Sequence, residues 1–294
     1  MTADNRSPVT VLGLGPMGQA LAGAFLGNGH PTTVWNRTAA KADALVARGA
    51  VRADTVADAI AASPLVIACV IDYDAVSAII DPSVDALKAR TLVNLTADTP
   101  ERARRMADWA AGHGVDYLDG AIMTPTPTIG GPAAVVLYSG PEALYQAHRP
   151  ALASLGGTAT YLGADPGRAA AHDVSLLDLF WTSMSGLVHA FALAGAEGIS
   201  ARDLAPFAKG IGALLPDLID EFARYVDDGH HPGDQSNILS ADAGMAHIIH
   251  AAQTRGIDTG VLSAARAVTR RAIDAGHGDD SFSRLAEVLG RPTP

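Results

Sequence analysis

A glycine-rich turn near the start of the chain has the residue types and spacing that bind a dinucleotide. Gly13, Gly15 and Gly18 follow an apolar run and precede an Ala-rich stretch that is typical of a helix. The first glycine permits a tight turn, the second lets the backbone approach a pyrophosphate, and the third lets helix and strand pack closely. A pyrophosphate here would meet the free N–H groups of the helix N-terminus. The turn predicts a cofactor-binding segment made of Gly13, Leu14, Gly15, Pro16, Met17 and Gly18.

The next predicted strand distinguishes between the two nicotinamide dinucleotides. NAD sites usually end this strand with Asp or Glu, which binds the ribose 2′-hydroxyl. No carboxylate ends the strand here. Arg37 and Lys41 instead supply a planar fork and a second positive charge, which suit a 2′-phosphate. The alternative to a phosphate site is that these basic residues lie by chance at a solvent-exposed helix start. We predict NADPH as the cofactor, bound in this region by Asn36, Arg37, Thr38 and Lys41.

Two further strand ends should border the cofactor, because ligands of parallel sheets lie outside the carboxyl ends of the strands. Val70 and Ile71 end one strand and are expected to pack against ribose or nicotinamide. Asn94 and Thr96 end the next, where Asn94 can hydrogen-bond the nicotinamide ribose or a substrate. Cys69 is expected to be a buried core residue, since nothing nearby in the sequence would lower the pKa of its thiol.

We single out one carboxylate, Asp173, in a long and mostly apolar segment over residues 167–195 that also contains Asp178. Burying an unpaired charge is costly, so this position needs a reason. At 3.6 residues per turn, the carboxylate shares one broad helix face with large apolar side chains, namely Leu177, Phe180, Trp181 and Met184. Such a face suits a hydrophobic cation. Partial exposure, or pairing with a neighbour such as Arg168, is the alternative.

The elements that position these residues change character near residue 164. Before it, β-rich runs alternate with helical stretches, which predicts an α/β fold with a parallel sheet and helices on both faces. After it, every stretch is typical of helix or loop. Asp165 and Pro166 are expected to start the long helix, as N-cap and first helical residue. The predicted strands are Val9–Leu14, Thr32–Asn36, Leu65–Val70, Thr91–Thr96, Tyr117–Ile122, Ala134–Ser139 and Thr158–Leu162.

Composition narrows the partners and the compartment. The net charge of −10 argues against a nucleic-acid surface, which would need a basic stripe. The one cysteine excludes an internal disulfide framework and fits a reducing cytoplasm. No apolar run is expected to reach the roughly eighteen residues that span a bilayer, and no metal site is predicted. A long helix that is apolar on most faces favours an oligomer that buries it.

Taken together, these motifs make the chain resemble the imine reductases, relatives of the β-hydroxyacid dehydrogenases. The likeness extends over nearly the whole chain and is carried by residues 13–18, 34–41, 94–96, 119–123, 137–140, 172–174, 181, 245–248 and 276–280. The resemblance implies a Rossmann domain over residues 1–163. It implies an interdomain helix and an all-α domain over residues 164–294, exchanged between the subunits of a domain-swapped homodimer. It also implies NADPH-dependent reduction of a C=N bond, with Asp173 where the dehydrogenases carry a catalytic lysine.

The sequence argues against the parent family itself. A β-hydroxyacid dehydrogenase needs a helix lysine and a Ser-Gly-Gly loop for the substrate carboxylate. No lysine lies between Lys88 and Lys209, and the loop segment 122–125 is Ile-Met-Thr-Pro. The site has lost groups that bind an anionic acid and has gained a carboxylate, which favours a cationic iminium.

We therefore hypothesise that Asp173 holds or supplies the proton on an imine nitrogen while hydride adds to carbon. Met123, Trp181, Met184 and partner-subunit residues near Met245 would exclude water from the reaction. Whether Asp173 acts as an acid or through its charge stays open, as do the natural substrate and the stereochemical preference. Three alternatives remain: a β-hydroxyacid dehydrogenase, a non-catalytic NADP(H)-binding protein, and coupling of a ketone with an amine before reduction.

Overall fold

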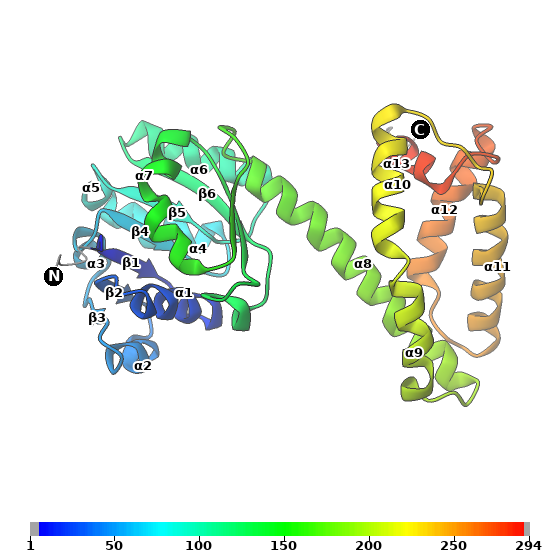
Figure 1. Ribbon diagram of the computed structural model, residues 1–294, viewed down its shortest axis with the longest axis horizontal. Coiled ribbons are helices and arrows are strands. Elements are labelled where there is room, and N and C mark those ends of the chain that lie inside the picture. Colours follow the sequence, from blue (N-terminus) through cyan, green and yellow to red (C-terminus); the bar gives the residue numbers. More distant parts are fainter. Residues whose placement is uncertain (1–5, 291–294) are drawn as a thin grey trace. The chain divides into compact units, whose positions relative to one another are not determined.

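The computed structural model describes residues 6–290, and within them one eight-stranded sheet forms the N-terminal half (Figure 1). Its spatial order is β3-β2-β1-β4-β5-β6-β7-β8. The strands are β1 (Val9–Leu12), β2 (Thr32–Trp35), β3 (Val51–Arg52), β4 (Leu65–Ala68), β5 (Thr91–Asn94), β6 (Asp116–Ile122), β7 (Val135–Ser139) and β8 (Thr158–Tyr161). Seven of these lie where they were predicted. The prediction missed β3, an exposed two-residue edge strand that is too short to show an apolar pattern.

The strand order places a crevice beside the glycine-rich turn. β1 pairs in parallel with β2 on one side and with β4 on the other. The connections that leave β1 and β4 therefore run to opposite sides of the sheet. At such a reversal the loops at the carboxyl ends of the two strands separate, and ligands of α/β proteins bind there.

The sheet is mostly parallel, as predicted, and β7 is the exception. β7 pairs antiparallel with β6, and β8 pairs in parallel with β7. The connection from β6 to β7 contains only the 3₁₀ helix η3 (Thr126–Thr128), so the chain returns along the neighbouring edge. A parallel pair needs a crossover of a dozen or more residues, usually with a helix. Helix α7 (Glu142–Leu152) provides that crossover between β7 and β8.

Helices cover both faces of the sheet, as the alternating sequence predicted. One buried cluster joins the sheet to α1, α2 and α7, and a second joins its other face to α3, α4, α5 and α6. The strands between them are apolar along their length because both faces are buried. The helices not yet given bounds are α1 (Pro16–Gly27), α2 (Asp43–Val46), α3 (Val56–Ala61), α4 (Tyr73–Ile80), α5 (Val84–Leu87) and α6 (Pro100–Gly112); the 3₁₀ helices are η1 (Ala39–Ala42), η2 (Asp81–Ser83) and η4 (Ala153–Leu155).

The long predicted helix is α8 (Arg168–Ala196), which begins three residues after Asp165. The Asp165 carboxylate accepts a hydrogen bond from the Gly167 N–H at 3.0 Å, so it caps the turn that leads into the helix. The Arg104 guanidinium binds the same carboxylate at 2.9 and 2.7 Å and lowers its pKa to about 2. Ser139 of β7 donates to the Pro166 carbonyl and accepts from the Ala169 N–H. These bonds fix the first turn of α8 against the sheet.

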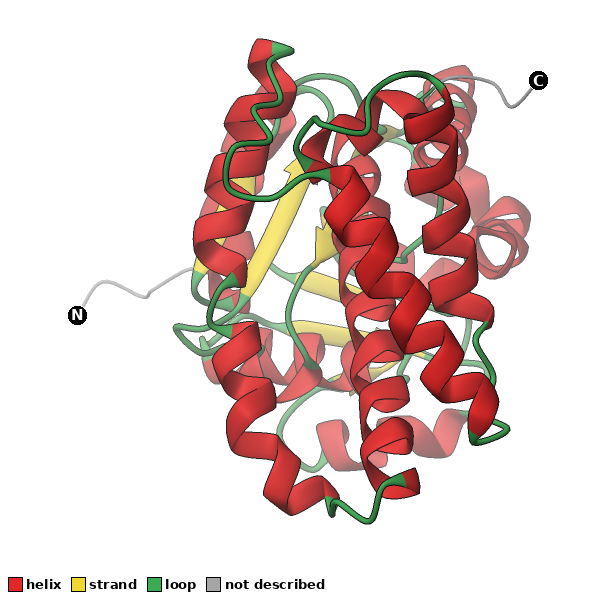
Figure 2. Cartoon of the chain, turned by 90° about the vertical axis from the view of Figure 1, so that its right-hand side faces the viewer, coloured by secondary structure: helices red, strands yellow, loops and turns green. Residues whose placement is uncertain are grey.

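The described residues that follow β8 form helices and loops only, as predicted (Figure 2). The chain divides into two compact units inside α8, residues 1–178 and residues 179–294. In the second unit α11 and α12 pack against each other. Its remaining elements are α9 (Ala201–Gly212), α10 (Leu215–Asp228), α11 (Ile238–Thr254), α12 (Gly260–Asp274), η5 (Phe282–Arg284) and α13 (Leu285–Leu289).

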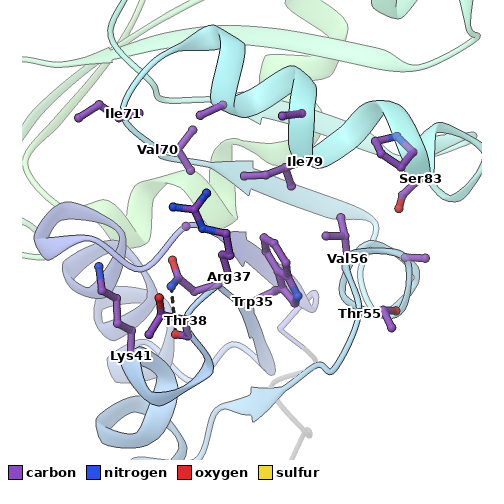
Figure 3. A pocket seen from close by; sticks show the side chains of 16 residues that line it. Trp35, Arg37, Thr38, Lys41, Thr55, Val56, Val70, Ile71, Ile79 and Ser83 are labelled. Atoms are coloured by element: carbon purple, nitrogen blue, oxygen red, sulfur yellow. Dashed lines mark hydrogen bonds between the residues drawn. The ribbon is translucent and has the colours of Figure 1, made fainter.

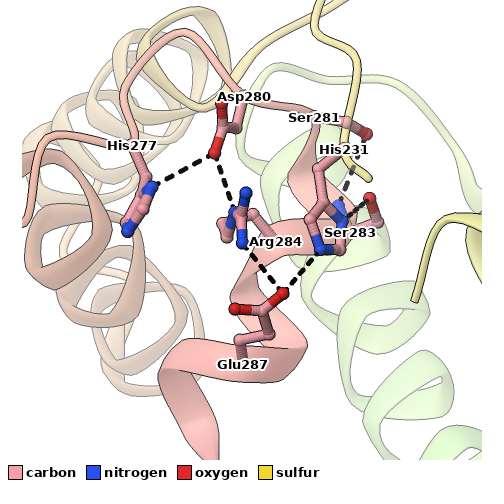
Figure 4. Close-up of polar contacts among 7 residues, drawn as sticks. All are labelled: His231, His277, Asp280, Ser281, Ser283, Arg284 and Glu287. Carbon is pink, nitrogen blue, oxygen red and sulfur yellow. Dashed lines mark hydrogen bonds and ion pairs between the residues drawn. The ribbon is translucent and has the colours of Figure 1, made fainter. Parts of the chain in front are cut away.

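A buried histidine ties the end of the chain to the loop after α10 (Figure 4). His231 contacts the Ser283 hydroxyl at 2.8 Å and the Glu287 carboxylate at 3.0 Å. Arg284 lies between Glu287 and Asp280 and contacts each at 2.8 Å. Ser283 is itself buried, so this group holds η5 and α13 in place.

The expectation that no segment of the chain is long and apolar enough to span a bilayer does not hold. Helix α8 is long and apolar enough to cross a membrane by length and composition, with a mean hydropathy of 1.3 in its best 18-residue window. The same criterion is met by helices that pack in protein cores. The sequence shows no continuous apolar run of that length, because His172, Asp173 and Asp178 interrupt the apolar residues of α8.

Candidate active site

The three glycines of the first turn have the surroundings that their predicted roles require. Gly13 has φ +97°, and a Cβ there would lie 2.3 Å from the Cys69 carbonyl oxygen. A Cβ on Gly18 would lie 2.0 Å from the Gly13 carbonyl oxygen, so helix α1 crosses the turn in close contact. A Cβ on Gly15, by contrast, would meet nothing within 4 Å. The turn is therefore closed on the protein side and open at Gly15, where a ligand could approach the start of α1.

A cavity of about 570 Å³ opens at the carboxyl ends of β1, β2 and β4 (Figure 3). It brings together seven of the predicted cofactor residues, Gly13, Asn36, Arg37, Thr38, Lys41, Val70 and Ile71. The other predicted residues lie in the turn and α1 (Leu14, Gly15, Pro16, Met17, Gly18) or at the end of β5 (Asn94, Thr96), outside the cavity lining. The cavity also uses residues that the sequence prediction missed, among them Trp35, Thr55, Ile79 and Ser83.

The polar residues after β2 differ in their surroundings: Asn36 hydrogen-bonds the backbone, whereas Arg37 and Lys41 are exposed to solvent. Asn36 accepts from the Leu14 N–H at 2.9 Å and donates to the Thr38 carbonyl at 3.0 Å. Its amide thus joins the glycine-rich turn to β2. Arg37 and Lys41 are exposed at the cavity, and neither forms an ion pair within residues 6–290. No described residue that lines the cavity is acidic. These residues fit a dinucleotide with a 2′-phosphate, because Arg37 and Lys41 are two positive charges at a cavity whose described lining has no carboxylate.

Residues of α4, β5 and β6 form a buried polar cluster that the sequence interpretation missed. The Tyr117 hydroxyl donates to Asp119 Oδ1 at 2.9 Å, and the Tyr73 hydroxyl donates to the same oxygen. Asn94 Nδ2 lies 3.5 Å from the Tyr117 hydroxyl oxygen. Burial is the largest cause that raises the pKa of Asp119, to about 7. A carboxylate in the apolar strand over residues 116–122 was the signal that could have revealed it.

Helix α8 places Asp173 in electrostatic contact with this cluster. Asp173 is 4% exposed, and burial raises the pKa of its carboxyl. Its charge in turn raises the pKa of Asp119. Within the described part of the chain no side chain pairs with Asp173, so the alternative of an ion pair with Arg168 is wrong. The residue is a buried carboxyl in the unit that contains the cofactor cavity.

The predicted substrate-binding residues are divided between the two units. Met123 packs half-buried against Ala121 and Ala169, and Leu177 is exposed on α8. In the second unit Phe180 and Trp181 are exposed, with ring centroids 5.1 Å apart. Met184 of α8 and Met245 of α11 are half-buried in that unit. Their role in substrate binding stays a prediction.

Cys69 is a core residue, as predicted. It is buried in the cluster that contains β1 and α1, and desolvation raises the pKa of its thiol to about 11. A thiol of that pKa is a poor nucleophile at neutral pH.

Two family profiles match consecutive parts of the chain. The profile described as the NAD binding domain of 6-phosphogluconate dehydrogenase matches residues 8–163. The profile described as the NADPH-dependent reductive aminase-like C-terminal domain matches residues 165–291.

Individual relatives are similar over nearly the whole length. The chain is 36% identical to an NADPH-dependent reductive aminase of Aspergillus oryzae, over 96% of each chain. An imine reductase from Myxococcus stipitatus, solved with NADP⁺, is 37% identical with a TM-score of 0.92, over 96% of this chain and 99% of that one. A reductive aminase from Aspergillus terreus, solved with NADPH4, cyclohexanone and allyl amine, is 37% identical with a TM-score of 0.87, over the same shares. The chain belongs to the family of NADPH-dependent reductive aminases and imine reductases.

Proposed function

We propose that this chain reduces imines and iminium ions to amines, with NADPH as the source of the hydride. The main observation behind this proposal is Asp173, a buried carboxyl that no described cation neutralises. A buried carboxyl of this kind either keeps a proton or attracts a cation. Both properties serve a C=N bond, whose nitrogen must become positive before its carbon accepts hydride. An anionic hydroxyacid would be repelled, which disfavours the β-hydroxyacid dehydrogenase alternative.

The cofactor would be held by the residues of the first unit. The open side of the turn at Gly15 and the start of α1 suit the pyrophosphate, and Arg37 and Lys41 suit the 2′-phosphate. Asn94 is fixed at the neighbouring strand end, because its Oδ1 accepts from the Thr96 N–H at 3.1 Å. The Val70 N–H donates to Thr96 Oγ1 at 3.1 Å and so connects the cavity wall to β5.

Steady-state rates of Asp173→Asn and Asp173→Ala with a cyclic imine test this function. We expect kcat/KM to fall by about a hundredfold in both, in the range that general acid catalysis supplies. Asp178→Asn is the matched control, since it removes an exposed carboxyl from the same helix, and it should retain the parent rate. Near-normal rates in both Asp173 variants would remove Asp173 from the mechanism. NADPH binding without turnover in the parent would instead favour a non-catalytic protein.

The same site also accounts for reductive amination, in which a ketone and an amine condense before reduction. The Aspergillus terreus relative was solved with a ketone and an amine, which supports extending this activity to the present chain. Product formation at near-equimolar amine is the measurement that separates coupling from capture of a preformed imine. A requirement for large amine excess would restrict the chain to imine reduction.

We further propose a domain-swapped homodimer that shares α8. The second unit exposes large apolar side chains on its helices, including Val188 (68%), Phe207 (75%) and Ile211 (70%). Exposed apolar area of this kind marks a surface that another protein covers. A second copy is favoured over a bilayer, because Asp173 and Asp178 would be costly within hydrocarbon. We also propose a cytoplasmic location, because a chain with one cysteine has no internal disulfide that would need an oxidising compartment.

A further inference from the structure

The loop that joins β4 to α4 (residues 69–72) forms part of the wall of the cofactor cavity. Val70 and Ile71 line the cavity from this β4–α4 loop, and Ile79 lines it from α4 (Figure 3). Ile71 is 86% exposed, so few protein atoms support its side chain. The position of this part of the wall therefore depends on how the backbone of the loop is held.

The β4–α4 loop is held by side chains of a second loop, which joins β5 to α6 (residues 95–99). The Val70 N–H donates to Thr96 Oγ1 at 3.1 Å, and the Tyr73 N–H donates to Asp98 Oδ2 at 3.3 Å. These two bonds lie on either side of Ile71. Neither Thr96 nor Asp98 is among the described residues that line the cavity. Both therefore act on the wall from outside the cavity.

The Asp98 carboxylate is fixed by further contacts. Its side chain is 12% exposed, and Arg102 Nη1 lies 3.3 Å from Oδ2. Oδ1 accepts from the Thr99 N–H at 2.7 Å. Arg102 also pairs with Asp74 in the first turn of α4. A carboxylate this buried is stable only when its oxygens are bonded, so these contacts hold Asp98 in the orientation that reaches the β4–α4 loop.

Helix capping does not explain Asp98. The cap of α6 is Thr99, whose hydroxyl accepts from the Arg102 N–H at 3.3 Å. The cap of α4 is Asp72, whose Oδ1 accepts from the Ala75 N–H at 2.8 Å. Both helices therefore have a cap without Asp98, and its bond to the Tyr73 N–H is an additional link between the two loops.

The side chain of Tyr73 has an anchor of its own. Its hydroxyl donates to Asp119, which is buried in β6, and the Arg102 guanidinium lies 5.9 Å from the centre of its ring. These contacts hold the start of α4 independently of the bond to Asp98. Loss of the Asp98 side chain should therefore leave α4 in place and release only the loop before it.

We infer that Asp98 is a positioning residue for the cofactor: it fixes the β4–α4 loop so that Val70 and Ile71 form the cavity wall before NADPH binds. A wall that is already ordered need not be ordered at the expense of binding energy, which raises affinity. The inference rests on the proposed function only in taking NADPH as the ligand of this cavity. It does not depend on the role of Asp173.

Asp98→Ala tests the inference, because it removes this link and leaves the Thr96 contact. We expect the Kd for NADPH, from fluorescence titration, to rise about tenfold, as for a lost hydrogen bond to a charged group. With saturating NADPH, kcat for a cyclic imine should stay within about twofold of the parent, since bound cofactor itself selects the ordered loop. In the cofactor-free variant the amides of residues 70–73 should exchange hydrogen faster, and NADPH should slow them again.

Glu101→Ala is the matched control. Glu101 pairs with Arg105 four residues further along α6, just as Asp98 pairs with Arg102. Its side chain is 76% exposed, and its described contacts do not reach the β4–α4 loop. This variant should keep the parent Kd for NADPH and the parent exchange rates.

A second variant, Asp98→Asn, keeps the test decisive if Asp98→Ala does not fold. Its one acceptor oxygen can serve the Tyr73 N–H or the Thr99 N–H, but not both as the carboxylate does. The Kd for NADPH should rise about threefold, because a hydrogen bond between uncharged groups is roughly half as strong as a charge-assisted one. The loop amides should exchange at rates between those of the parent and of Asp98→Ala.

The outcomes distinguish this inference from the proposed function. Variants of Asp98 with the parent Kd for NADPH would overturn the inference, whether or not their loop exchanges faster. Weaker binding together with faster exchange throughout the first unit would also overturn it, since that result shows a general loss of structure. A parent protein that binds no NADPH would instead defeat the proposed function.

Discussion

At the scale of single residues, the chemistry is divided between exposed cations and buried carboxyls. Arg37 and Lys41 lie at a cavity whose described lining contains no acidic residue, so their charge is available to a ligand. Asp119 and Asp173 lie in the interior, where desolvation raises both pKa values. The first pair is suited to hold an anion, and the second pair to manage a proton.

Removing the two cavity cations should weaken NADPH selectively. The double variant Arg37→Ala with Lys41→Ala is expected to raise KM for NADPH by about tenfold to a hundredfold, because hydrogen bonds to charged groups contribute about 1.5–3 kcal/mol. KM for NADH should change little, since NADH lacks the 2′-phosphate. Lys88→Ala removes a cation that pairs with Asp85 outside the cavity and is the control. Equal losses for both cofactors would contradict the assignment.

At the scale of elements, the glycine-rich turn connects β1 to α1 with two different constraints. Gly18 is needed by the fold, because any side chain there would meet the backbone of Gly13. Gly15 is not, because its surroundings are open. The position of α1 against the sheet therefore depends on Gly18, and access to the start of α1 depends on Gly15.

Two single substitutions should separate folding from binding in this turn. Gly18→Ala is expected to lower the free energy of unfolding by about 2 kcal/mol or more, as core overpacking does. Gly15→Ala should unfold within about 0.5 kcal/mol of the parent, since an open helix cap tolerates a methyl group, but should bind NADPH more weakly. Urea unfolding and cofactor titration measure the two effects. A Gly15→Ala protein with parent affinity would contradict the placement of the pyrophosphate.

At the scale of the whole molecule, a helix of 29 residues runs from the cofactor unit into the second unit. Phe180 and Trp181 are exposed on it, and α9 and α10 expose further apolar residues. An isolated chain with this much apolar surface would tend to associate. The proposed homodimer would cover this surface.

Charges introduced on this surface should prevent assembly. The double variant Phe207→Asp with Ile211→Asp is expected to sediment as a monomer at concentrations where the parent sediments as a dimer. Val51→Asp places the same charge on an equally exposed apolar residue of the edge strand β3, and it should leave the dimer intact. A dimer that survives the double variant would show that this surface lies outside the interface.

The fold was largely predictable from sequence, because period and composition are local properties. The apolar runs located seven strands, and the Asp165-Pro166 pair predicted the start of α8 two residues before its first helical residue, Arg168. The reversed direction of β7 was not predictable, because it depends on where a short loop returns in space. The two-residue strand β3 carries too few side chains for any pattern.

What the sequence by itself determined is the set of groups that can do chemistry: the glycine turn, the basic strand end and a carboxylate on an apolar helix. Only the tertiary structure decided which of them share an environment. Tyr73 and Asn94 lie far from β6 in the chain. The Tyr73 hydroxyl reaches Asp119, and the Asn94 amide reaches Tyr117, only because β4, β5 and β6 are neighbours in the sheet. The close packing of Gly13 and Gly18 is visible only in the structure, and so is the burial of Asp119, a carboxyl that the sequence did not single out, in addition to Asp173.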